Sequence, residues 1–270
     1  MKTTLQLLLV TLVLGLGTRV QAQERNRVVL TVVAHPDDET FLGPVLARYA
    51  REGAKVYVAF ASRGEKGVRK HAGTSEGDEL ADLRHSEAIC SCQQLKVEEP
   101  FFFGVNDAEL GMLTQPLDKN IQKVANEVEK LIAKLNPDVI LTWGPEGGYG
   151  HLDHRLVSSA VTQVVQAMKT PPRLFYVGFS TDQAKVMNET NSGPWHNEYT
   201  WHATDPARLP VRVAYSTADQ QASHRALECH KTQWTPEEMQ NLQRSLDAAW
   251  NGRVFFRPWF GNHASKDLFR

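Results

Sequence analysis

A histidine and three consecutive carboxylates stand together in the segment Ala34-His35-Pro36-Asp37-Asp38-Glu39. Carboxylates repel phosphate and attract cations, so this segment favours a metal site over an anion site. His35 and Asp38 are three residues apart, a spacing that can bring an imidazole and a carboxylate to one point in a tight turn. Nitrogen and oxygen ligands of this kind suit zinc and related divalent metals. Asp37 then remains free to act as a base on a metal-bound water.

A purely structural role for the same residues has to be weighed. Acidic side chains are common at helix N-termini because the helix dipole favours them there. Pro36 stiffens the turn, and a proline and a histidine within the same six residues favour a functional site over a capping cluster. A nucleotide-binding loop does not fit, because no G-x-G-x-x-G pattern follows Val33.

A second group of candidate ligands is His151-Leu152-Asp153-His154. His151 and His154 are again three residues apart, at the predicted start of a helix. One of them can complete a metal triad with His35 and Asp38, and the other can act as an acid or as a donor to an oxyanion. Asp153 can hold an imidazole in the required tautomer. Taken alone this pattern is weak, since a polar surface turn explains it nearly as well.

Strands and helices alternate through the first two-thirds of the chain. Apolar, β-branched runs predict strands, and apolar residues at helical spacing predict helices. This order is typical of a Rossmann-like α/β fold, a doubly wound and mostly parallel sheet flanked by helices. The predicted strands are 28–33, 55–61, 100–103, 139–143 and 174–178, and the predicted helices are 40–51, 79–95, 117–135 and one marked by apolar residues from 156 to 168.

The C-terminal third is less regular in its pattern. No linker separates residues 180–270 from what precedes them, so we expect an irregular extension of one domain that spans 23–270. Thr235-Pro236-Glu237-Glu238 predicts a helix start, with a Thr cap, a proline at the first position and a glutamate at the third.

The predicted topology brings the two motifs together. In a doubly wound sheet of order 3-2-1-4-5, the first and fourth strands are neighbours, and ligands bind beyond their carboxyl ends. Both motifs directly follow these two strands. We therefore expect the loops 34–39 and 151–154 to face each other across one site.

With these two motifs, the sequence resembles the PIG-L/LmbE-like zinc-dependent N-deacetylases. That family includes enzymes that deacetylate N-acetylglucosaminyl-phosphatidylinositol and the glucosaminyl-inositol precursor of mycothiol. The resemblance covers roughly residues 28–233, and the AHPDDE run is its most specific part. The other similar segments are HxDH at 151–154, Ser62-Arg63-Gly64-Glu65, Arg84-His85-Ser86-Glu87-Ala88 and His230-Lys231-Thr232-Gln233.

The resemblance implies roles for individual residues. It implies one zinc ion per chain, held by His35, Asp38 and His154, with iron(II) as an alternative metal for the same ligands. It implies Asp37 as general base, His151 as the group that stabilises the oxyanion and Asp153 as the residue that orients His151. It implies that Arg84 and Arg63 contact substrate hydroxyls or phosphate.

Some of these residues also fit a purely structural role. Arg84 can instead pair with Glu87 on a solvated helix face, and His230 fits the core or the surface as well as a site. The segment 183–205 has no clear family equivalent. Its aromatic residues can stack on a sugar or simply cover the sheet. The sequon Asn188-Glu189-Thr190 is a glycosylation site if the source is eukaryotic.

The first residues predict export. Lys2, an apolar run from Leu5 to Gly17 and a small residue at Ala22 are typical of a secretory signal peptide, 1–22, removed after Ala22. An uncleaved anchor is the alternative, although the apolar run is short for a membrane span, and no later segment predicts one. The mature protein is then periplasmic or extracellular.

The three cysteines, Cys90, Cys92 and Cys229, are too few for a disulfide framework. Either of the first two can pair with Cys229 in an oxidising compartment, but we expect buried, inert thiols.

Composition excludes some partners. Thirty basic residues balance thirty-one acidic ones, for a net charge of −1, so no basic field predicts binding to nucleic acid. The predicted function is removal of an acetyl group from an N-acetylated sugar such as an N-acetylglucosamine conjugate. The alternatives are an amidase of a larger thiol- or peptide-sugar conjugate and a non-catalytic sugar- or metal-binding protein. The sequence leaves the oligomeric state open.

Overall fold

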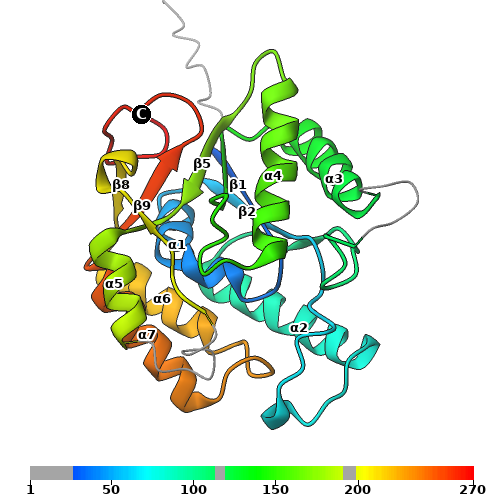
Figure 1. Ribbon diagram of the computed structural model, residues 1–270. Helices are drawn as coiled ribbons and strands as arrows, with labels where there is room; N and C mark the ends of the chain where they lie inside the picture. Colours follow the sequence, from blue (N-terminus) through cyan, green and yellow to red (C-terminus); the bar gives the residue numbers. More distant parts are fainter. Residues whose placement is uncertain (1–26, 113–118, 191–198) are drawn as a thin grey trace, which may run out of the picture.

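A computed structural model of the protein describes residues 27–112, 119–190 and 199–270 (Figure 1). The predicted signal peptide, residues 1–22, lies outside the described residues. In chain order the elements are β1 (Val28–Val33), η1 (Asp38–Phe41), α1 (Gly43–Arg51), β2 (Lys55–Phe60), η2 (Lys70–Ala72), α2 (Asp78–Leu95), β3 (Phe101–Phe102), α3 (Lys119–Leu135), β4 (Val139–Trp143), α4 (Leu152–Ala167), β5 (Arg173–Val177), β6 (Phe179–Ser180), α5 (Thr181–Thr190), β7 (Ala203–Thr204), η3 (Pro206–Arg208), β8 (Val211–Ala214), α6 (Thr217–Leu227), α7 (Pro236–Trp250) and β9 (Arg253–Pro258).

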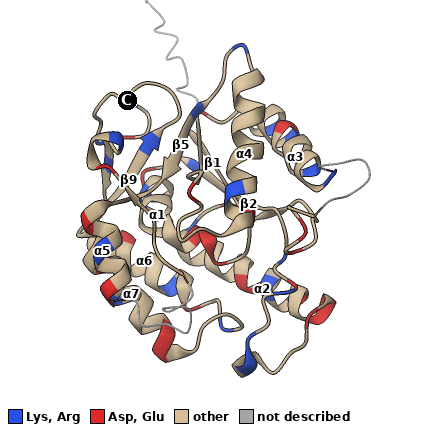
Figure 2. Cartoon of the chain, viewed as in Figure 1, with Lys and Arg blue, Asp and Glu red and all other residues tan. Residues whose placement is uncertain are grey.

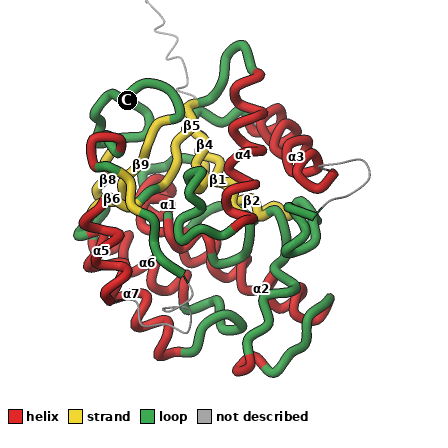
Figure 3. Tube along the Cα trace, in the orientation of Figure 1, coloured by secondary structure: helices red, strands yellow, loops and turns green. Residues whose placement is uncertain are grey.

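The core of the fold is a seven-stranded sheet of order β3-β2-β1-β4-β5-β9-β8 (Figure 3). The first five of these strands are parallel, in the predicted order 3-2-1-4-5. β9 joins β5 antiparallel, and β8 joins β9 antiparallel. The predicted α/β class is therefore confirmed, and β1 and β4 lie side by side at the centre of the sheet.

Helices cover both faces of this sheet, which explains why its central strands are apolar throughout. All six residues of β1 and all five of β4 are buried. One apolar core packs α3 and α4 against one face, and a second packs α1, α2, α5, α6 and α7 against the other (Figure 1). Cores on both faces hold β1 and β4 in place, and with them the loops that carry the two motifs.

The C-terminal third is more regular than its pattern indicates. It contributes three helices and the two antiparallel strands of the main sheet, so it extends the same sheet. The predicted start of α7 is confirmed, because Thr235 and Glu238 form a reciprocal capping box. The first helix begins later than predicted, at Gly43, because Asp38–Phe41 form a 3₁₀ turn that keeps the acidic loop out of the helix.

No helix within the described ranges is long and apolar enough to cross a membrane. Basic and acidic residues are interspersed over the outer helices (Figure 2).

Candidate active site

The two motifs meet at the carboxyl ends of β1 and β4. Asp38 Oδ1 lies 2.9 Å from His154 Nε2, and Asp38 Oδ2 lies 3.8 Å from His35 Nδ1. The ring of His151 is 4.9 Å from that of His35 and 4.7 Å from that of His154 between centroids. The predicted convergence of the loops 34–39 and 151–154 is therefore present in the structure.

Asp38 is held by the backbone of its own loop. The N–H groups of Ala34 and His35 both donate to Asp38 Oδ2, at 2.9 Å each. Burial raises the pKa of this carboxyl, but positive charge on the adjacent His154 and His35 rings, when they are protonated, outweighs burial and holds the pKa well below its usual range. Asp38 is thus an anionic group at a fixed position.

His154 presents an unused nitrogen to this carboxylate. Its Nδ1 bonds to the carbonyl oxygen of Gly147 at 3.2 Å, which assigns the proton of a neutral ring to Nδ1, and its ring stacks on Trp143. Nε2 is buried and has no hydrogen-bond partner among the described residues. A lone pair on Nε2 and the oxygen of Asp38 therefore face each other at 2.9 Å. Such a pair needs a positive charge beside it, which fits a divalent cation.

His35 is oriented by two carboxylates on its far side. Its Nε2 lies 3.1 Å from Asp107 Oδ1 and 3.3 Å from Asp153 Oδ2, so Nδ1 faces the Asp38 side. Burial disfavours the charged ring, but hydrogen bonds to Asp107 and Asp153 prevail and raise the pKa of His35 to about 10. Carboxylates on the outer nitrogen of a histidine are the usual means of orienting a metal ligand.

Asp107 is a site residue that the sequence reasoning missed. It is buried, and its other oxygen accepts the backbone N–H of Lys66 at 3.0 Å. The position of Asp107 in the chain could have indicated its role, because Asp107 follows β3 and the carboxyl end of β3 lies at the same edge of the sheet.

Asp153 orients a different imidazole from the one expected. Its carboxylate contacts His35, whereas its contact with His151 is made by the backbone N–H, which donates to His151 Nδ1 at 3.2 Å. The reason is that His151 caps the start of α4. The positive end of that helix and the two neighbouring histidines disfavour charge on the ring, and burial, the largest cause, lowers the pKa of His151 to about 4. His151 is thus neutral, with its proton on Nε2.

Asp37 lies beside the ligand pair in an unusual backbone conformation. Its φ is 107°, a value rare for any residue other than glycine. Its carbonyl accepts the Thr40 hydroxyl, and its N–H donates to Glu39 Oε2 at 2.9 Å. Burial raises the pKa of Asp37 to about 6, and the nearby Arg84 guanidinium limits the rise. A carboxyl with such a pKa can take and return a proton near neutral pH.

Arg84 is buried, so the alternative of a solvated pair with Glu87 is wrong. Its guanidinium donates to the carbonyl oxygens of Gly64 and Pro36, at 2.9 and 2.5 Å, and lies 3.3 Å from Asp37 Oδ2. Gly64 has φ +70°, and a Cβ there would lie 2.1 Å from Arg84 Nη1. Arg84 lines the pocket, but its hydrogen bonds go to backbone carbonyls of the protein. These bonds connect the acidic loop to the loop at 62–67.

Arg63 is placed away from the site, contrary to its predicted contact with substrate. It pairs with Asp82 at 2.7 Å and with Asp78 at 3.5 Å on the surface. It does not line the pocket within the described part of the chain. The Gly-rich loop that carries it turns its side chain outward.

A pocket of about 220 Å³ opens over these residues. Its floor is formed by Arg84, Asp107 and the motif residues His35, Asp37, Asp38 and His151. Its outer wall is neutral and largely aromatic. The wall residues are Phe41, Gly67, Tyr149, Met187, Asn188, Tyr199, Trp201, Gln233, Trp234 and Leu242.

The aromatic segment 183–205 contributes to this wall in two ways. Trp201 is buried and packs on Phe41, whereas Tyr199 is 38% exposed at the pocket. Trp195 and His196 lie outside the described residues.

Asn188, the residue of the sequon, uses its amide to bond both the N–H and the carbonyl of Trp201, at 2.8 and 3.1 Å. A glycan on that amide would break the bond to the Trp201 carbonyl.

Behind the acidic loop lies a buried polar cluster formed by Glu39, Ser91 and His230, which are all 0% exposed. Glu39 Oε1 accepts from the Ser91 hydroxyl and bonds His230 Nε2 at 2.6 Å. Burial raises the pKa of Glu39, but His230 and Ser91 lower it more, so the net direction is downward. The sequence allowed His230 a place in the core, on the surface or in the site. The structure places it in the core beside the site.

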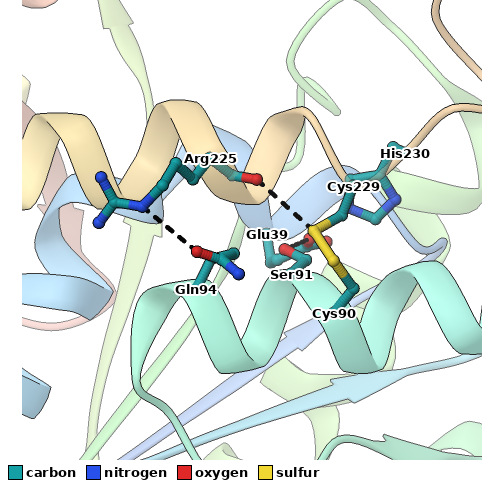
Figure 4. Close-up of a disulfide and its surroundings, with 7 residues drawn as sticks. All are labelled: Glu39, Cys90, Ser91, Gln94, Arg225, Cys229 and His230. Atoms are coloured by element: carbon teal, nitrogen blue, oxygen red, sulfur yellow. Dashed lines mark hydrogen bonds and ion pairs between the residues drawn. A yellow bond between two sulfur atoms is a disulfide. The ribbon is translucent and has the colours of Figure 1, made fainter.

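A disulfide joins Cys90 to Cys229 next to this cluster (Figure 4). The expectation of inert thiols is therefore wrong for these two cysteines and right for Cys92, which is free and buried. The pairing was hard to foresee because 139 residues separate the partners. Only the packing of α2 against the end of α6 brings them together.

An α/β sheet with histidines and carboxylates gathered at the carboxyl ends of its central strands defines a candidate metal-dependent enzyme. A family model described as "PIG-L: GlcNAc-PI de-N-acetylase" matches residues 30–165, and the chain belongs to this family.

Curated relatives carry related names. A 1D-myo-inositol 2-acetamido-2-deoxy-alpha-D-glucopyranoside deacetylase of Actinosynnema mirum is 29% identical over 234 residues, which cover 77% of this chain and 81% of that protein. A protein of the same name from Rhodococcus erythropolis is 34% identical over 158 residues, which cover 53% of this chain and 54% of that protein.

Solved structures share the fold at low sequence identity. A deacetylase of the teicoplanin biosynthesis pathway has a TM-score of 0.64 at 15% identity, over 86% of this chain and 97% of its own. The N,N'-diacetylchitobiose deacetylase of Pyrococcus horikoshii has a TM-score of 0.61 at 17% identity, over 86% and 83%. GalB, the 4-carboxy-2-hydroxymuconate hydratase of Pseudomonas putida, also has a TM-score of 0.61 at 17% identity, over 87% and 97%. The fold alone therefore does not specify deacetylation.

Proposed function

We propose that this chain is a metal-dependent hydrolase that removes the acetyl group from an N-acetylated amino sugar. The observation that carries the proposal is that Asp37 and Asp38 line one pocket below a neutral, largely aromatic wall, with the buried Nε2 of His154 2.9 Å from Asp38 Oδ1. Membership of the PIG-L family and the names of the relatives support the choice of substrate. The products are acetate and a free amino sugar.

His35, Asp38 and His154 are the residues that would hold the metal. They supply two nitrogens and one oxygen, which suits zinc, with iron(II) as the alternative. The orphaned Nε2 of His154 is the sign that these residues fit a cation. When bound, a divalent ion there lowers the pKa of a water and polarises the acetamide carbonyl. Asp107 and Asp153 keep the His35 ring in its liganding orientation.

Asp37 is the base in this proposal. Its carboxylate lies on the pocket floor, and Arg84 fixes its loop from behind through Pro36 and Gly64. With a pKa of about 6, Asp37 is ionised at neutral pH and takes the proton of the attacking water. The same carboxyl then returns this proton to the departing amine.

His151 is the donor to the oxyanion. Because its Nδ1 accepts the N–H of Asp153, its proton lies on Nε2, the nitrogen that remains available in the pocket. The pKa of about 4 keeps the ring neutral throughout the working range. A single well-placed donor of this kind contributes roughly 3–4 kcal/mol to the stability of a transition state.

The pocket favours an uncharged substrate of modest size. Ligand pockets commonly measure about 300–1,000 Å³, so a pocket of about 220 Å³ suits one sugar ring and its acetamide. The charged residues that line it among those described all belong to its floor.

Acetate release from a panel of N-acetylglucosamine compounds tests the proposal. The panel contains the methyl glycoside, diacetylchitobiose, the inositol conjugate and the 1-phosphate, each assayed before and after chelation and after addition of Zn²⁺ or Fe²⁺. We expect release from the neutral compounds, its loss on chelation and its return with metal. Release of no acetate from any of them contradicts the proposal. Turnover of a larger thiol- or peptide-sugar amide alone supports the amidase alternative.

We further propose that the protein is exported after removal of residues 1–22. The Cys90–Cys229 disulfide supports this, because such bonds persist in oxidising compartments and are rare in the cytosol. N-terminal sequencing of the protein from its native host tests it. A mature chain that still begins at Met1 contradicts cleavage.

A further inference from the structure

The acidic loop is attached from behind to a residue far along the chain. Glu39 uses both of its carboxylate oxygens as links. Oε2 accepts the backbone N–H of Asp37 at 2.9 Å, and Oε1 bonds Nε2 of His230 at 2.6 Å. A short path of two hydrogen bonds thus connects His230 to the backbone of the proposed base.

This path matters because of the conformation of Asp37. A φ of 107° is unfavourable for a residue with a side chain, so the surrounding bonds have to hold it. The Asp37 N–H bond to Glu39 is one of these bonds. Glu39 is 0% exposed, and without His230 its carboxylate loses its partner of opposite charge in the core.

His230 itself lies in an irregular segment. α6 ends at Leu227 and α7 begins at Pro236, so His230 belongs to the turns between them. The disulfide attaches Cys229, its immediate neighbour, to Cys90 on the 18-residue helix α2. Ser91, next to Cys90, donates to the same oxygen of Glu39 that His230 bonds (Figure 4). Each of the two donors to Glu39 Oε1 therefore directly follows a half-cystine in the sequence.

We propose that His230 is a positioning residue for the base Asp37, and that the Cys90–Cys229 disulfide holds His230 in register with Glu39. Nε2 is the ring nitrogen that serves this role, because Nδ1 has no partner among the residues described. A second tie, from Glu87 to the N–H and hydroxyl of Thr232 at 2.7 Å each, limits how far the segment moves when the disulfide is absent. Removal of the disulfide therefore weakens the register without releasing the segment.

Two pairs of variants test the proposal, whose kinetic readout rests on the proposed deacetylase function. His230→Phe removes the donor to Glu39, whereas His230→Gln can restore one N–H. Cys90→Ser/Cys229→Ser removes the disulfide, whereas Cys92→Ala changes a free buried thiol on the same helix. We expect His230→Phe to lower kcat roughly hundredfold, His230→Gln to recover part of it, and the disulfide variant to lower it roughly tenfold. We expect the KM and the zinc content of these variants to stay within about twofold of the wild-type values. The kcat of the control Cys92→Ala is also expected to stay within about twofold of the wild-type kcat.

The linkage has its own test. The combined variant carries His230→Phe together with Cys90→Ser/Cys229→Ser. In this background we expect His230→Phe to lower kcat by a smaller factor than it does with the disulfide intact, because both changes act on one contact. Independent, additive losses overturn the linkage. Wild-type kcat in His230→Phe, or equal losses in His230→Phe and His230→Gln, overturns the positioning role.

A readout without catalysis separates this proposal from the proposed function. Amide hydrogen exchange of the peptide that contains Asp37 reports directly on its N–H bond to Glu39. We expect faster exchange at Asp37 in His230→Phe and in the disulfide variant, with protection elsewhere in β1 unchanged. Unchanged exchange overturns the proposal, even if the wild-type protein deacetylates sugars. Faster exchange supports it even if no acetylated sugar is a substrate. If the disulfide variant does not fold, exchange in the His230 variants decides.

Discussion

Asp38 Oδ1 and His154 Nε2 lie 2.9 Å apart, although neither atom has a proton to donate to the other when the neutral ring carries its proton on Nδ1 and donates it to the carbonyl of Gly147. Backbone N–H groups hold the Asp38 carboxylate, and Trp143 holds the His154 ring. Neither group is free to turn away from the other. A bound cation, as proposed, would make this contact between two electron-rich atoms favourable. The four predictions below concern the residues around it.

His154→Ala is expected to lose the metal. The ring supplies one of three proposed ligands, and a pair of ligands alone holds a divalent ion far more weakly. Elemental analysis of the purified variant measures this, with His224→Ala as the control, because His224 pairs with Asp247 away from the pocket. A full complement of zinc in His154→Ala removes this residue from the set of ligands.

Asp37→Asn is expected to keep its metal and lose most of its turnover. The amide cannot accept the proton of water, and general base catalysis typically contributes about 10²–10⁴-fold. Acetate release and metal content are measured on the same preparation, so that loss of the ion is separated from loss of the base. Wild-type rates in this variant rule out Asp37 as the base.

His151→Ala is expected to lower kcat by roughly 10²–10³-fold with little change in KM, as for other lost oxyanion donors. The metal content stays at the wild-type level because the three proposed ligands remain. His151→Gln keeps an N–H donor and serves as the matched control. An increase in KM alone, with kcat preserved, assigns His151 to substrate binding instead.

The acid side of the pH profile is expected to follow Asp37. Its pKa of about 6 is an upper bound for the metal-loaded protein, because a bound cation lowers the pKa of a neighbouring carboxyl. The base works when ionised, so kcat/KM falls as the pH drops through this pKa. Arg84→Gln removes a positive charge beside Asp37, which raises the pKa and moves the fall to higher pH. Arg84→Lys keeps the charge and leaves the profile near that of the wild type, and a shift to lower pH in Arg84→Gln contradicts the assignment.

The sequence predicted the centre of the sheet and the two loops at its edge because both depend on local patterns. Apolar β-branched runs identify β1 and β4, and the order of parallel strands brings their loops together. The boundaries of α2 and β4 differ from their predictions by at most one residue. These features depend on residues that are neighbours in the chain or in adjacent strands.

The features that were missed depend on packing between distant helices. Glu39 and His230 are 191 residues apart, and their contact follows from how the end of α6 packs behind the acidic loop. The choice of His35 over His151 by the Asp153 carboxylate depends on His151 serving as a helix cap. Arg84 and Arg63 looked alike in the sequence, but the tight turn at Gly64 separates a buried guanidinium from an exposed one.

The pocket draws all of its floor, but only part of its outer wall, from the stretch that the family model matches. The floor residues all lie within 30–165, the part that the family model matches, whereas the wall residues Met187, Tyr199, Trp234 and Leu242 lie beyond it. We expect substitutions at these four wall residues to change the preference for substrate and to leave the floor residues in place. A chimera that takes the wall residues after 165 from a relative, but keeps Cys229 and His230, is expected to inherit the relative's preference for substrate and to retain the positioning of Asp37.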